Sequence, residues 1–125
     1  MRVLLVEPGK EPVLQEINGS LKSMQEIVGG TIQALYPFEE HVALICNDEG
    51  KLLGLPFNRA LRYETGGMYD VICGTFFLCG APSDSDCFEG LTETQAEKYT
   101  KLFSRPELIL AVDNMIVVIT TDPSE

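Results

Sequence analysis

The sequence predicts an α+β fold, in which a mixed or antiparallel sheet of about five to six strands carries two helices on one face. Short apolar runs bounded by turn formers indicate the strands, and two segments with helical spacing of apolar residues indicate the helices. The chain has 125 residues, 45% of them hydrophobic, which suits one core. We therefore expect a single α+β domain over residues 1–125, with residues 121–125 frayed.

The first part of the chain predicts two strands and a helix. Residues 2–6 form a β-type run that ends at the turn 7–10, and residues 12–17 form a weaker one. Ser20 is a good N-cap for a helix that Pro37 would end. Gly29-Gly30 interrupts this helix and marks either close packing on the sheet or a break. The apolar face of the expected helix comprises Leu21, Met24, Val28, Ile32 and Leu35.

The middle of the chain is predicted to form strands. Residues 41–46 precede the turn formers of residues 47–50, and a hairpin partner is expected to start at Lys51. Pro56 limits central pairing, so the chain is expected to leave the sheet from Leu55. Residues 69–78 form one long strand pattern, and the Gly74 within it suggests a bulge or a close backbone contact.

The last part of the chain predicts a helix and further strands. Thr92 and Gln95 have the spacing of a capping box for a helix over residues 92–103. The apolar runs 108–112 and 115–119 follow it around an Asp113-Asn114 turn, and the continuous run 115–119 suits a buried strand.

The residues present support few kinds of metal, nucleotide-binding or catalytic site. One histidine and four cysteines without a C-x-x-C pair make a zinc site improbable, and no P-loop or G-x-G-x-x-G fingerprint occurs. Asp84-Ser85-Asp86 begins like a calcium loop, but later positions do not match one. His41 has no accompanying nucleophile motif. We expect no enzyme, no catalytic residue, no metal and no cofactor.

The cysteines and the N-terminal segment predict the cellular compartment of the protein. The apolar run near the N-terminus is too short for a signal peptide, and no run is long enough to span a bilayer. A cytoplasmic location is therefore expected, with thiols rather than disulfides. Cys46 and Cys73 suit buried positions, whereas the sequence leaves open whether Cys79 and Cys87 meet.

The charge distribution identifies a first candidate site. The formal net charge is −10, yet residues 50–63 contain three basic residues and no acid. An anionic ligand could bind there, because a guanidinium matches carboxylate or phosphate and an aromatic ring stacks. Alternatively, the arginines neutralise acids such as Glu64, and Phe57 and Leu61 belong to the core. The candidate ligand-binding residues are Lys51, Phe57, Asn58, Arg59 and Arg62.

The overall charge also limits the partners. A pI near 4.4 argues against direct binding to nucleic acids and against anionic membranes. An acidic surface instead favours a basic protein, although the charge could serve solubility alone. The candidate protein-binding residues are Asp84, Asp86, Glu89, Glu93 and Glu97.

Several segments resemble a bacterial and phage family of unknown function, numbered 3846. They are VEPGKEP, GSLKSMQEIVGGTIQALYPF, NDEGKLLGLPFNRAL and YDVICGTFFLCG, and they span about residues 3–80. The resemblance implies no catalytic residues, but it does imply a setting among accessory genes of phages and mobile elements. Small acidic proteins in that setting often antagonise host defence.

Three hypotheses follow. The first is a non-enzymatic, anti-CRISPR-like inhibitor that binds a basic host protein, such as a nuclease, through its acidic surface. The second is a sponge that holds an anionic nucleotide signal at Lys51, Asn58 and Arg59. The third is an interaction module that forms a homodimer through an apolar sheet edge.

Overall fold

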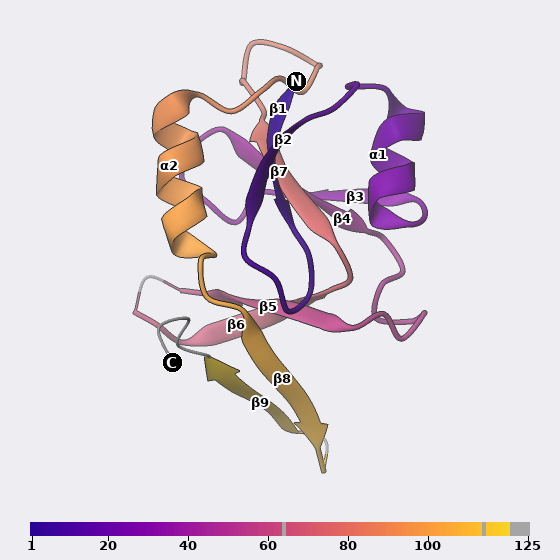
Figure 1. Ribbon diagram of the computed structural model, residues 1–125, viewed down its shortest axis with the longest axis vertical. Helices are drawn as coiled ribbons and strands as arrows, with labels where there is room; N and C mark the ends of the chain where they lie inside the picture. Colours follow the sequence, from indigo (N-terminus) through magenta and orange to yellow (C-terminus); the bar gives the residue numbers. More distant parts are fainter. Residues whose placement is uncertain (64, 114, 121–125) are drawn as a thin grey trace.

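A five-stranded antiparallel sheet forms the centre of the molecule (Figure 1). The computed structural model describes residues 1–63, 65–113 and 115–120, so the fraying expected for residues 121–125 lies outside the described residues. The order across the sheet is β2-β1-β7-β4-β3, and each neighbouring pair is antiparallel. The predicted α+β class with an antiparallel sheet is confirmed. The five strands are β1 (Arg2–Val6), β2 (Val13–Glu16), β3 (Ile32–Leu35), β4 (Val42–Asn47) and β7 (Phe76–Gly80).

The two helices lie on opposite faces of this sheet (Figure 1). The helix α1 (Leu21–Val28) packs Met24 and Val28 into one cluster, and α2 (Glu93–Leu102) packs Ala96 and Tyr99 into the other. Successive residues of a strand point to opposite faces, and every residue of β4 and β7 is buried. The predicted placement of both helices on one face was therefore wrong. The continuous apolar runs of β4 and β7 are typical of strands covered on both sides.

The first helix is shorter than predicted. Ser20 caps its N-terminus as expected, with the side chain accepting from the Ser23 amide. Gly29 ends it in the left-handed conformation (φ 80°), which only glycine adopts without strain. Ile32 and Leu35 therefore belong to β3 instead of the helix, because the Gly29-Gly30 pair is a break.

The segment after β4 forms turns instead of a hairpin partner. Residues 48–54 contain no strand, and β5 (Phe57–Arg62) pairs with β6 (Met68–Cys73) in a separate two-stranded sheet. Gly74 (φ 85°) divides the predicted long strand into β6 and β7. A Cβ atom there would lie 2.8 Å from Leu55 Cδ1, so the close contact expected at this glycine is present.

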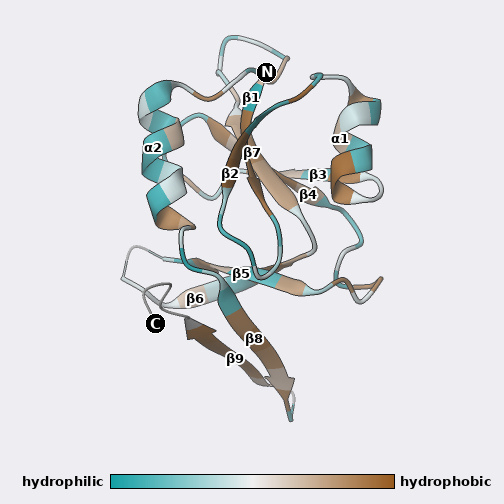
Figure 2. Cartoon of the chain, in the orientation of Figure 1, coloured by the Kyte–Doolittle hydropathy of each residue, from teal (hydrophilic) through white to brown (hydrophobic). Residues whose placement is uncertain are grey.

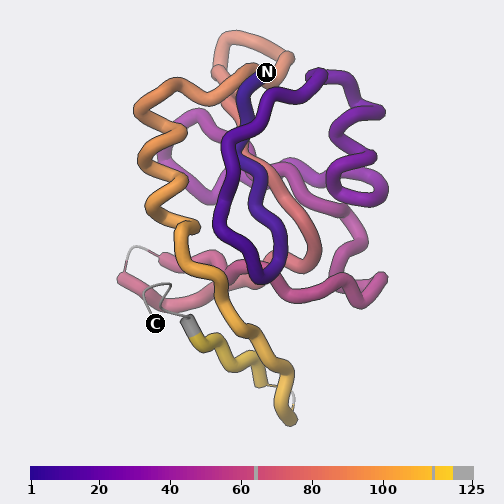
Figure 3. The backbone as a smooth tube through the Cα atoms, viewed as in Figure 1, coloured from indigo at the N-terminus to yellow at the C-terminus, as the bar shows by residue number. Residues whose placement is uncertain are grey.

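The last two strands form a hairpin that extends from the end of the molecule opposite the N-terminus (Figures 1 and 3). The strands are β8 (Glu107–Val112) and β9 (Met115–Thr120). Figure 2 shows that both are hydrophobic along most of their length. The preceding α2 has the predicted capping box of Thr92 and Gln95. None of the described helices is long and apolar enough to cross a membrane.

Candidate functional site

Arg59 lies inside the protein, where it connects three segments of the chain. Its side chain is 1% exposed. Nη2 donates to the carbonyl oxygens of Lys10 (2.6 Å) and Phe103 (3.1 Å), and Nη1 donates to Asn58 Oδ1 (2.9 Å). Burial lowers the pKa of this guanidinium. Because Phe103 caps the C-terminus of α2, the cation also lies at the negative end of a helix dipole.

Asn58 connects the two-stranded β5–β6 sheet to the central sheet. Its side chain is fully buried, and Nδ2 donates to the carbonyl oxygens of Val6 and Gly74, each at 2.9 Å. Asn58 and Arg59 together therefore act as a polar clamp between the two sheets and α2. Their polar atoms are directed at backbone carbonyls within the protein.

The structure separates the candidate ligand-binding residues. Asn58 and Arg59 form the buried clamp, whereas Arg62 pairs with the buried carboxylate of Glu107 at 2.7 Å. Glu64, the acid expected to neutralise the arginines, lies outside the described residues. Lys51 and Phe57 both line a groove between the β5–β6 sheet and the β8–β9 hairpin. The structure thus brings together two of the five candidates at one open surface.

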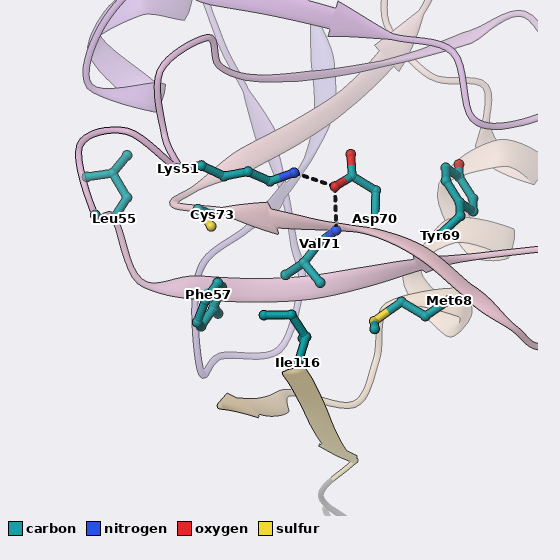
Figure 4. Close-up of a pocket in the computed structure, with 10 residues that line it drawn as sticks. Lys51, Leu55, Phe57, Met68, Tyr69, Asp70, Val71, Cys73 and Ile116 are labelled. Carbon is teal, nitrogen blue, oxygen red and sulfur yellow. Dashed lines mark hydrogen bonds and ion pairs between the residues drawn. The ribbon is translucent and has the colours of Figure 1, made fainter. Parts of the chain in front are cut away.

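This groove has a volume of about 660 Å³ and is mainly apolar (Figure 4). Lys51 Nζ pairs with Asp70 Oδ1 at its rim, and the same oxygen accepts from the Val71 amide at 2.8 Å. The ion pair cancels the charge of Lys51, so the groove has the chemistry to receive an apolar group. The apolar side chains that line it are Leu55, Phe57, Met68, Tyr69, Val71 and Ile116.

Sequence reasoning missed most of this groove. Its lining comes from the loop after β4, from the start of β5, from β6 and from β9, and β9 is distant from the others in the sequence. Met68 and Tyr69 of β6 are 39% and 43% exposed, and of these two only Tyr69 was placed in the predicted strand pattern of residues 69–78. The one sequence signal for it was Pro56, from which the chain was predicted to leave the central sheet at Leu55.

The five candidate acids lie on an exposed loop and on the helix that follows it, and together they are called here the acidic surface. Asp84, Asp86 and Glu89 lie in the loop before α2, and Glu93 and Glu97 lie on the helix itself. All five are exposed, and no ion pair involves any of them among the described residues. Residues 63–97 contain no lysine or arginine.

Two backbone arrangements hold the acidic surface in place. Gly80 and Glu89 exchange hydrogen bonds of 2.7 and 2.9 Å, which tie the loop to the end of β7. The Leu91 amide donates to the Arg2 carbonyl oxygen at 2.9 Å. Figure 1 shows this loop beside the N-terminus, at the end of the molecule opposite the hairpin. The acids are therefore displayed on a supported surface and not inside a cavity.

Several basic residues are occupied elsewhere in the protein. Lys10 pairs with Glu7, Lys51 with Asp70, Arg62 with Glu107 and Lys98 with Glu40. These four cations are therefore engaged with acids outside the acidic surface.

The described residues contain no group of three or more His, Cys, Asp or Glu side chains placed to hold a metal ion. All four cysteines are free thiols. Cys46, Cys73 and Cys79 are buried, and burial raises the pKa of Cys79 to about 12. Cys87 is exposed, and Cys79 and Cys87 are not joined by a disulfide in this structure.

Glu40 links the loop before β4 to α2 in a way that depends on pH. Its Oε1 accepts from Lys98 Nζ at 2.7 Å and from the Tyr99 hydroxyl at 2.9 Å. These two bonds, with Lys98 the larger contributor, lower the pKa of Glu40 below its ordinary value of 4.5. The stabilisation is therefore complete above pH 4.5 and is lost as the pH falls through the lowered pKa.

We expect Tyr99→Phe to lower the free energy of unfolding by about 1 kcal/mol at pH 7, because one hydrogen bond to a carboxylate is lost. The difference from the wild type should shrink at acid pH, where Glu40 is protonated in both proteins. Urea unfolding at pH 7 and at lower pH measures it, with Tyr36→Phe on an exposed tyrosine as the control. A difference that stays constant with pH would contradict the role of Glu40.

Comparison with known proteins identifies a family. No curated protein and no solved structure matches the chain. A family model described as Domain of unknown function (DUF3846) matches residues 1–104, which include the central sheet, both helices and the β5–β6 sheet but not the β8–β9 hairpin. The resemblance found in the sequence is thereby confirmed, and the chain belongs to the DUF3846 family.

Proposed function

We propose that this protein is a non-enzymatic binding module that engages a basic partner protein through its acidic surface. The observation that carries the proposal is the group of five exposed carboxylates within residues 84–97, none of which takes part in an ion pair among the described residues. Such a surface attracts a basic protein over a long range and orients it during approach. A net charge of −10 adds to this attraction.

The shape of the acidic surface favours a macromolecule over a small ligand. The acids lie on a loop and on a helix, and none of them lines the groove. Glu93 and Glu97 are four residues apart on α2, so their carboxylates lie on one side of the helix. A row of carboxylates of this kind can occupy a groove that otherwise binds the phosphates of a nucleic acid.

The family setting suggests the class of partner. Accessory proteins of phages and mobile elements often act on host defence, and defence nucleases present basic grooves to nucleic acids. We therefore propose a defence nuclease of the host, such as a CRISPR nuclease, as the partner, with inhibition by competition for its nucleic-acid groove.

The nucleotide sponge ranks below this function. Arg59 and Asn58 would have to leave carbonyl partners inside the protein to reach a ligand. Lys51 alone remains at an open surface, and it is paired with Asp70. A thermal-shift panel of nucleotides tests the sponge, and saturable stabilisation that Lys51→Ala abolishes would favour it.

The test of the main proposal changes the acids in two matched sets. The first variant converts the five acids of the acidic surface to Asn or Gln, and the control converts five other exposed acids and so changes the net charge equally. Each immobilised protein captures partners from a host lysate for mass spectrometry, and the captured protein is then purified for affinity measurements. The control positions are Glu11, Glu26, Glu39, Asp48 and Glu49.

We expect a basic protein whose affinity falls about 10-fold or more between low and physiological salt and about 100-fold in the first variant. The control should retain its affinity to within a few-fold. Equal binding by the first variant and the wild type would show that the acidic surface is not the binding site. An equal loss in both variants would assign the effect to net charge alone.

A further inference from the structure

We infer that the β8–β9 hairpin is a dimerisation element, on which a second copy of this chain packs face to face about a twofold axis. The contact surface is one side of the hairpin, called here the aliphatic face. This inference concerns the opposite end of the molecule from the acidic surface and does not depend on the proposed function.

The register of the hairpin gives its two sides different environments. Directly opposed residues of an antiparallel pair share a side, and successive pairs alternate. One side carries Glu107, held by Arg62 and by the Ala60 amide, and the buried Ile109 opposite Val118. Ile116 on this side lines the groove. This side therefore packs toward the β5–β6 sheet.

The other side is entirely apolar and open to solvent. Its three cross-strand pairs are Leu108 with Ile119, Leu110 with Val117, and Val112 with Met115. The exposed fractions of these six residues range from 40% for Val117 to 66% for Met115. No polar or charged residue lies among them. A strand pair with a polar outer side would be expected if water covered it in the working protein.

The exposed area of the aliphatic face is large enough for a weak dimer. The six residues expose about 500 Å² in total, which is near the upper end of the largest apolar patch on a typical monomer. Two such faces in contact would bury about 1,000 Å², which is the lower limit for a biological interface and suits a weak, reversible dimer. The same patch on both copies satisfies a twofold axis, because each residue finds the corresponding residues of its partner.

Face-to-face packing explains more than edge-to-edge pairing does. Within the described chain no strand pairs with the outer edge of β9, so a second copy could extend the sheet there. That arrangement would leave all six side chains exposed and would double the apolar area on one side. Two hairpins packed about 10 Å apart bury them, as two sheets of a sandwich do.

The charge distribution permits this contact despite the net charge of −10. Among the described hairpin residues the acids are Glu107, which is paired, and Asp113, which lies at the turn. The acidic surface lies at the opposite end of the molecule (Figure 1). Screening over about 8 Å at physiological salt therefore leaves little repulsion between the two hairpins.

The experiment is sedimentation velocity of the full chain over a concentration series. The first variant is Leu110→Lys with Val117→Lys, the central pair of the aliphatic face, and the second is Leu110→Thr with Val117→Thr, which keeps strand propensity. The matched control is Leu52→Lys with Leu102→Lys, two exposed leucines outside the hairpin. Circular dichroism establishes that each variant is folded, and the threonine pair decides if the lysine pair does not fold.

We expect a wild-type dimer with a Kd in the micromolar range, weakened about 100-fold or more by the lysine pair and about 10-fold by the threonine pair. The control should dimerise like the wild type. A monomer at all concentrations, or a dimer that neither pair weakens, would overturn the inference. So would a ladder of larger species, which would indicate edge-to-edge growth. If the wild type is monomeric and floats with neutral phosphatidylcholine vesicles, the aliphatic face binds a lipid surface and the inference of a dimer is overturned.

Discussion

Replacing Arg59 with alanine is expected to lower the free energy of unfolding by about 3–4 kcal/mol, a large fraction of the stability of a domain this size. The substitution leaves the carbonyl oxygens of Lys10 and Phe103 and Asn58 Oδ1 buried without their donors. It also opens a cavity between the two sheets and α2. Urea unfolding followed by circular dichroism measures the change.

Two further substitutions test whether the loss of stability is specific to the guanidinium of Arg59. Lys22→Ala removes an exposed cation without a described partner and should change stability by less than about 0.5 kcal/mol. Arg59→Lys keeps the charge, but one ammonium cannot replace a planar fork with several donors, so most of the loss should remain. A fully stable Arg59→Ala protein would show that the clamp is dispensable and would reopen this residue as a ligand contact.

Truncating either phenylalanine of β7 is expected to cost about 3–5 kcal/mol, since each leaves a large cavity in a closed core. Phe76 packs on the α2 side, where its ring lies 5.5 Å from that of Phe103, and Phe77 packs on the α1 side. Both are fully buried. Phe76→Ala and Phe77→Ala should therefore destabilise the protein to a similar degree in urea unfolding.

This comparison tests the arrangement of the helices directly. Tyr36→Ala, at a residue that is 63% exposed, serves as the control and should have an effect below about 1 kcal/mol. If both helices covered one face of the sheet, one of the two phenylalanines would be exposed, and its truncation would resemble that of Tyr36. A large loss at only one of them would contradict the two-sided core.

The two candidate binding surfaces lie at opposite ends of the molecule, so each end could bind a different partner. The acidic surface lies beside the N-terminus, and the aliphatic face lies on the hairpin at the opposite end (Figures 1 and 2). A dimer formed through the hairpins would direct its two acidic surfaces away from each other. Such a dimer could hold two basic partners, and the avidity gained would depend on their spacing.

Local signals predicted the elements whose boundaries depend on nearby residues. The Ser20 cap and the Thr92–Gln95 capping box were confirmed, because a cap is a contact between residues three apart. Of the bulge and the close contact expected at Gly74, the close contact is present, but the strand predicted around this glycine is divided there into β6 and β7. Residues 32–35 were assigned to a helix wrongly, because their apolar spacing fits both a helix and a strand.

By itself the sequence determined the α+β class, the helix caps, the family and the charge contrast between residues 50–63 and the remainder of the chain. Only the tertiary structure decided what that contrast means. The role of a charged side chain depends on the atoms around it. Besides the neighbouring Asn58, the partners of Arg59 are the carbonyl oxygens of Lys10 and Phe103, both more than 40 residues away in the chain. The sheet topology likewise decided which apolar residues are buried. In the folded chain both sides of β4 and β7 are covered, whereas one side of the β8–β9 hairpin is exposed to solvent.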